Sequence, residues 1–60
     1  MKVLLEAGVW LADGEGDPPR TLAEDNAKEF PNTASALKGL ADARIHRPFK
    51  NAEIQEEFLF

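Results

Sequence analysis

The 60-residue sequence has no cysteine and a single histidine, His46. Without cysteine, neither a disulfide framework nor a cysteine-based zinc site can hold the chain together. The absence of disulfides is compatible with the reducing cytoplasm. His46 has no second histidine and no adjacent serine or cysteine motif with which to share general-base work. We therefore expect a solvated histidine at a helix end, no catalytic residues, no enzyme activity and no cofactor.

Long apolar runs are also missing. The apolar start of the chain is interrupted at once by Glu6, whereas a secretory signal needs roughly 7–15 uninterrupted apolar residues. Nothing approaches the ~18 consecutive apolar residues of a membrane span. We expect a cytoplasmic location without a membrane partner.

The length limits the chain to one small domain, residues 1–60. A domain of this size buries only about 60% of the surface that its unfolded chain exposes. The composition, 43% hydrophobic and 30% charged, is typical of a folded globular protein. Such a chain folds, but it lacks the volume for a deep catalytic cleft.

Charge is distributed unevenly along the chain. The net charge is −4, with a net −4 in residues 1–31, +3 in residues 32–50 and −3 in residues 51–60. A dedicated duplex-DNA binder usually has a basic face and a high pI, and the pI here is about 4.8. The acidic loop residues Asp13, Glu15, Asp17 and Glu24 share the spacing of a calcium loop. Pro18 stands where such a loop needs glycine, so we expect a solvated acidic turn and no metal site.

Hydrophobic periodicity predicts the elements. Residues 2–12 alternate between apolar and mixed positions, which predicts one strand with a bulge or bend at Gly8. Glycines and prolines make residues 13–19 a loop. Residues 20–30 fit either a second strand paired with the first or a helix, and the strand is preferred because a lone strand is unstable.

Asn32 or Thr33 is expected to cap an amphipathic helix that ends near Arg47, because Pro48 cannot continue it. Residues 51–60 predict a third strand, whose acidic residues discourage unwanted edge pairing. The fold class is therefore α+β, in the order β-β-α-β, with one helix on one face of a three-stranded antiparallel sheet. The expected core is Val3, Leu5, Val9, Leu11, Leu22, Phe30, Leu37, Leu40, Ala41, Ile45, Phe49, Ile54 and Phe58.

Arg44 is the residue whose position conflicts with its chemistry, because it falls inside the apolar arc of the helix between Leu37 and Leu40. We expect its stem to cover the sheet while its head reaches water. The alternatives are an ion pair with Glu24 or Glu56, and an anion site.

Two surfaces are candidates for binding. An apolar surface for a protein partner consists of Trp10, Phe58, Leu59 and Phe60. A small domain with an apolar tail has reason to form a homodimer, although Trp10 also fits a simple covering role and the tail also fits the core. An anion patch, with weak and salt-sensitive nucleic-acid or phosphate binding, would use Arg20, Arg44, Arg47 and Lys50. An acidic mimic of DNA, of the kind phages use, is a third interpretation.

Several short motifs are similar to a known pattern. They are Gly16-Asp17-Pro18, Arg20-Thr21-Leu22, Asn26-Ala27-Lys28, Ala36-Leu37, Ala43-Arg44, Arg47-Pro48-Phe49 and Ala52-Glu53-Ile54. Together they span most of residues 9–54 and resemble a family of small bacterial and phage-encoded proteins of unknown function. The resemblance implies a small cytoplasmic protein from a phage or mobile element, and it implies no catalytic or binding residues.

Overall fold

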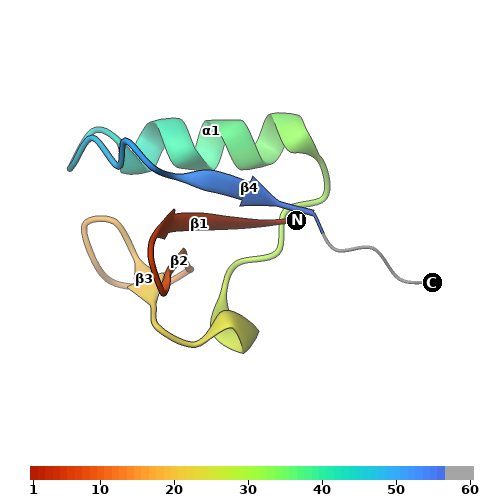
Figure 1. The fold of residues 1–60 in the computed structure, drawn as a ribbon, viewed down its shortest axis with the longest axis horizontal. Coiled ribbons are helices and arrows are strands. Elements are labelled where there is room, and N and C mark those ends of the chain that lie inside the picture. The colour runs from red at the N-terminus through yellow and green to blue at the C-terminus, as the bar shows by residue number, and fades with distance from the viewer. Residues whose placement is uncertain (57–60) are drawn as a thin grey trace.

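A computed structural model describes residues 1–56, which form a four-stranded antiparallel sheet and one α-helix (Figure 1). The strands are β1 (Lys2–Glu6), β2 (Val9–Leu11), β3 (Arg20–Thr21) and β4 (Glu53–Gln55). A 3-10 helix, η1 (Glu24–Asn26), and the α-helix α1 (Thr33–Ala43) lie between β3 and β4 in the sequence. The sheet order is β3-β2-β1-β4. The α+β class is confirmed, but the described residues contain four strands where three are predicted.

The fourth strand arises because the chain reverses at Ala7 and Gly8, inside the predicted first strand. β1 and β2 pair antiparallel, with Leu4 opposite Trp10. Gly8 has a φ of +73°, a left-handed conformation that costs glycine little. The prediction of one strand over residues 2–12 is therefore wrong, because this glycine closes a hairpin instead of bending a strand.

The apolar face that the sequence predicts for residues 2–12 still faces the core. The register of the hairpin shifts between Leu4 and Glu6, which is the signature of a bulge. Because the bulge adds one residue to β1, both halves of the hairpin keep their apolar positions on the inner side. Val3, Leu5 and Leu11 are buried, and Val9 packs against them.

The predicted second strand, residues 20–30, is only two residues long. β3 pairs with β2 through Arg20 and Thr21. The Thr21 hydroxyl then accepts a hydrogen bond from the Ala23 amide at 3.1 Å, and such a local turn competes with a sheet ladder. The rest of the segment forms η1 and an extended stretch whose Lys28 amide donates to the Leu11 carbonyl at 2.9 Å.

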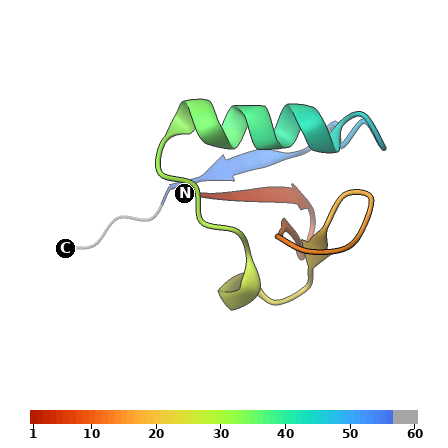
Figure 2. The ribbon, with the colours of Figure 1, turned by 180° about the vertical axis from the view of Figure 1, so that it is seen from behind.

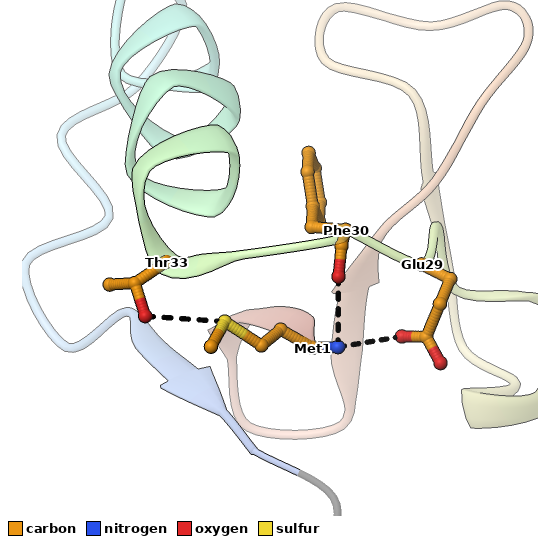
Figure 3. Close-up of polar contacts among 4 residues, drawn as sticks. All are labelled: Met1, Glu29, Phe30 and Thr33. Carbon is orange, nitrogen blue, oxygen red and sulfur yellow. Dashed lines mark hydrogen bonds and ion pairs between the residues drawn. The ribbon is translucent and has the colours of Figure 1, made fainter.

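This stretch ends at Phe30, where the chain is tied to Met1 (Figure 3). The Phe30 amide donates to the Met1 carbonyl at 2.7 Å. The Met1 amino group in turn donates to the Phe30 carbonyl at 3.1 Å and to Glu29 Oε2 at 2.9 Å. The Thr33 hydroxyl reaches the Met1 sulfur at 3.4 Å. These contacts hold the start of β1 against the chain that enters α1.

α1 begins as predicted, with Asn32 as the N-cap. Its side-chain oxygen accepts from the Ser35 amide at 2.8 Å, satisfying one of the amides that a helix start leaves free. The helix ends at Ala43, earlier than the predicted end near Arg47. The amides of Ile45 and His46 bond to carbonyls three residues back, because the last turn tightens before Pro48 forces the chain to be extended.

α1 packs on β1, β2 and β4 (Figures 1 and 2). The buried core is Val3, Leu5, Leu11, Phe30, Ala36, Leu40, Ala43 and Phe49. Six of these are predicted, and Val9 and Ile54 lie partly buried against them. Four predicted core residues are instead exposed, namely Leu22, Leu37, Ala41 and Ile45. Phe58 lies outside the described residues.

The helix exposes Leu37 and Ala41 because its apolar arc is wider than the surface that the sheet covers. Only the stripe of Ala36, Leu40 and Ala43 faces inward. At about 100° per residue, Leu37 and Ala41 lie on one flank of this stripe and Gly39 lies on the other. The small alanines bring α1 close to the sheet, so the flank beyond Leu40 remains open.

The predicted last strand, residues 51–60, is β4 over Glu53–Gln55 within the described part of the chain. It pairs antiparallel with β1, with Ile54 opposite Val3. Ile54 therefore faces the helix, while Glu53 and Gln55 face the other side. Before β4, Phe49 is buried and has a positive φ of 44°, which is unusual for a bulky residue.

Gly39 carries the first prediction, because its missing side chain makes room for Phe30. A Cβ there would lie 2.7 Å from Phe30 Cζ and 3.3 Å from Leu11 Cδ2. Alanine gains about 1 kcal/mol in helix propensity, but overpacking a core costs about 1–3 kcal/mol. We expect Gly39→Ala to lower the free energy of unfolding by about 1 kcal/mol in denaturant melts.

The control is the same substitution in a Phe30→Leu background, where the ring atoms that meet the new Cβ are gone. There we expect Gly39→Ala to stabilise the protein. Stabilisation already in the wild-type background would show that Phe30 does not need this space.

Candidate interaction surfaces

The largest exposed apolar side chains among the described residues are Leu22, Leu37 and Ile45. Their exposed fractions are 82%, 53% and 78%, respectively. Leu37 lies on the open flank of α1, Ile45 follows in the turn after the helix, and Leu22 follows β3. None belongs to the surface predicted from sequence. Periodicity assigns all three to the core. The width of the buried stripe distinguishes Leu37, whereas Leu22 and Ile45 are exposed where β3 and α1 end earlier than predicted.

Trp10 is half-buried on the sheet face opposite α1. Its cross-strand neighbours are Leu4 on β1 and Thr21 on β3. Such cross-strand contacts stabilise a sheet by themselves, so this position fits the covering role that the sequence also allows. Phe58, Leu59 and Phe60, the rest of the predicted apolar surface, lie outside the described residues.

The four cations of the predicted anion patch come from two parts of the chain. Arg20 is on the edge strand β3, where its guanidinium donates to the Pro18 carbonyl at 2.9 Å. Arg44, Arg47 and Lys50 belong to the connection between α1 and β4. Arg47 lies 3.9 Å from a Glu6 oxygen, so part of its charge is already balanced.

Arg44 is exposed and acts on the backbone of this connection. Its Nε donates to the Pro48 carbonyl at 3.1 Å, and its Nη2 donates to the Phe49 carbonyl at 3.4 Å. Its head reaches water as expected, and it makes neither of the alternative ion pairs with Glu24 and Glu56. The guanidinium therefore ties the end of the helix to Phe49, the residue with positive φ.

A shallow hollow of about 220 Å³ lies beside the other flank of α1. Leu11, Pro18 and Phe30 line it together with His46 and Asp42. It is smaller than the roughly 300–1,000 Å³ of typical ligand sites. A neighbouring hollow of about 330 Å³ shares Phe30 and Asp42 with it. His46 thus lies at the rim of a small open depression near the end of the helix.

The charges around these hollows are paired with each other. Lys28 Nζ is 3.1 Å from Asp13 Oδ1, and Lys38 Nζ is 3.6 Å from Asp42 Oδ2. No three His, Asp or Glu side chains of residues 1–56 converge in a way that could hold a metal ion. Asp13, the first residue of the calcium-like spacing, contacts a lysine instead.

No helix within residues 1–56 has the length and apolarity to cross a membrane. Comparisons of the chain with models of protein families, with curated proteins and with solved structures found no match. The resemblance to a family of small phage and bacterial proteins therefore stays a prediction.

The structure predicts a modest cost for Arg44→Met, which keeps an apolar stem and removes both hydrogen bonds to carbonyls. Because the side chain is exposed, we expect the free energy of unfolding to fall by about 1 kcal/mol in denaturant melts. Lys38→Met is the matched control, since it removes another exposed cation of the same region and should cost about 0.5 kcal/mol or less. A loss of about 3–5 kcal/mol that Glu24→Gln or Glu56→Gln restores would indicate a buried ion pair instead.

The net charge of −4 and the contact of Arg47 with Glu6 also predict weak interaction with nucleic acids. We expect no saturable binding when fluorescence anisotropy is measured with short single-stranded and duplex probes at low salt. Tight binding that falls steeply with salt and is weakened by Arg47→Ala with Lys50→Ala would contradict this expectation.

Proposed function

We propose that this protein is a small non-enzymatic interaction module that binds a protein partner and acts as a homodimer. The observation that carries the proposal is the exposure of Leu22, Leu37 and Ile45, while the core formed by residues 1–56 has eight buried hydrophobic residues. Leucine and isoleucine side chains stabilise a fold when they are buried. A marginal core that leaves three of them in water gains most from a partner that covers them.

The nature of the exposed surface indicates a macromolecular partner. The two hollows are shallow, and the charges at their rims are paired within the chain. Small-molecule sites instead enclose most of their ligand. None of the three exposed apolar side chains, Leu22, Leu37 and Ile45, lines either hollow.

Ile45 provides the test for the partner, because it is exposed at the end of the helix without supporting the core. We expect Ile45→Ser to keep the fold, as judged by circular dichroism, and to weaken binding of a purified partner at least about fivefold. The partner is first found by affinity capture and mass spectrometry with the wild-type chain as bait. A partner that the wild type, Ile45→Ser and Leu22→Ser bind equally would contradict a role for this surface.

A further inference from the structure

The unpaired edge of β4 and an exposed apolar flank of α1 lie on the same side of the molecule. β4 is the last strand of the sheet, and no other strand of residues 1–56 pairs with its outer edge. Gly39 contacts Phe30 and Leu11 of the β2 side. Leu37 and Ala41, on the opposite flank, therefore lie on the β4 side, where both are exposed.

One further strand beside β4 would complete both features. It would satisfy the free hydrogen-bonding groups of the β4 edge. Its inward-facing side chain would also lie under the flank of Leu37, since strands in a sheet are about 4.8 Å apart. An apolar residue is therefore required at the inward-facing position of the added strand.

We propose that this strand is β4 of a second copy, paired edge to edge and antiparallel about a two-fold axis. Ile54 of one copy then lies opposite Ile54 of the other, and Leu37 of each copy covers this apolar pair. The two-fold axis leaves both helices on the same face of a continuous eight-stranded sheet. This inference rests on the proposed homodimer and names the surface that forms it.

The outward face of β4 is self-complementary in this register. Glu53 of each copy lies opposite Gln55 of the other. Within one chain, Gln55 Nε2 already donates to Glu53 Oε2 at 3.0 Å, on the exposed face. The same amide and carboxylate can therefore bond across the interface, and symmetry makes this contact twice.

The glutamates that the sequence places at this edge select the register. Shifting the pairing by two residues in one direction places Glu53 opposite Glu53. Shifting it in the other direction places the apolar Ile54 opposite the charged Glu56. Like charges directly opposite each other destabilise a strand pair, and a shift by one residue turns Ile54 away from the helix side. The acidic residues thus oppose other pairings and permit this one.

The experiment is sedimentation of the 60-residue chain from a few micromolar to several hundred micromolar. We expect the mass to rise from 6.6 kDa towards twice that value with concentration. Gln55→Glu places glutamates opposite each other at two symmetric positions and should raise the dimer Kd about tenfold or more. The exchange Glu53→Gln with Gln55→Glu restores complementary pairs and should return the Kd to near the wild-type value.

Leu37→Ser tests the helix flank separately, and Leu22→Ser is its matched control beside β3. We expect Leu37→Ser to raise the dimer Kd at least about fivefold and Leu22→Ser to leave it unchanged. Circular dichroism and denaturant melts confirm that each variant folds. Because the edge and the flank are altered independently, one misfolded variant leaves the other test intact.

A dimer that is insensitive to both Gln55→Glu and Leu37→Ser would overturn this inference and leave the homodimer in place on another face. A Gln55→Glu effect that the exchange does not restore would overturn the register. A monomer at every concentration would overturn both the inference and the homodimer, while binding of a different protein partner would be decided by the Ile45 experiment.

Discussion

The packing of Phe30 against Gly39 is the contact on which the rest of the structure depends. A Cβ at residue 39 would lie within 2.8 Å of two atoms of the Phe30 ring, so only glycine lets the ring lie directly on the helix. Phe30 is also bonded through its backbone to Met1, at the start of the central strand. The Phe30 side chain therefore fixes the distance between α1 and the sheet. The Phe30 backbone, through its bonds to Met1, fixes the start of β1 (Figure 3).

This contact also determines which side of the molecule is left open. Phe30 fills the space between α1 and the β2 side, where Leu11 joins it. On the β4 side, Phe49 is buried in the core and Ile54 packs against it, yet Leu37 remains 53% exposed. An exposed apolar flank of the helix thus lies beside the strand edge that no other strand of residues 1–56 pairs with.

The sequence predicts those features that depend on local chemistry. The Asn32 cap, the start of α1 and the inward alternation of Val3, Leu5 and Leu11 follow from side-chain chemistry and periodicity. The hairpin at Gly8 was missed because the bulge preserves the apolar alternation across the turn. The alternation therefore looks the same for one long strand and for two short ones.

The surfaces were harder to predict than the fold. A helical wheel gives the apolar arc of α1, but the sheet and Phe30 decide which part of the arc is buried. Leu37, Ala41 and Ile45 therefore appeared to be core residues. The predicted anion patch draws on two parts of the chain, Arg20 on β3 and the connection after α1. No periodicity in the sequence reports how two such segments are arranged in space.

Arg44 links the two elements with exposed features, α1 with its apolar flank and β4 with its free edge. Its hydrogen bonds to the carbonyls of Pro48 and Phe49 fasten the end of α1 to the chain that leads into β4. Phe49 has a positive φ there and is buried, so this connection has one specific shape held from both sides. The turn that follows closes with the Ala52 amide on the Phe49 carbonyl at 3.0 Å, directly before β4. The position of α1 over the sheet thus depends on two contacts. One is the pair of Arg44 hydrogen bonds at the end of the helix, and the other is the packing of Phe30 against Gly39. Arg44, whose place in the apolar arc conflicts with its charge, is thus the residue that joins the end of the helix to the chain entering β4.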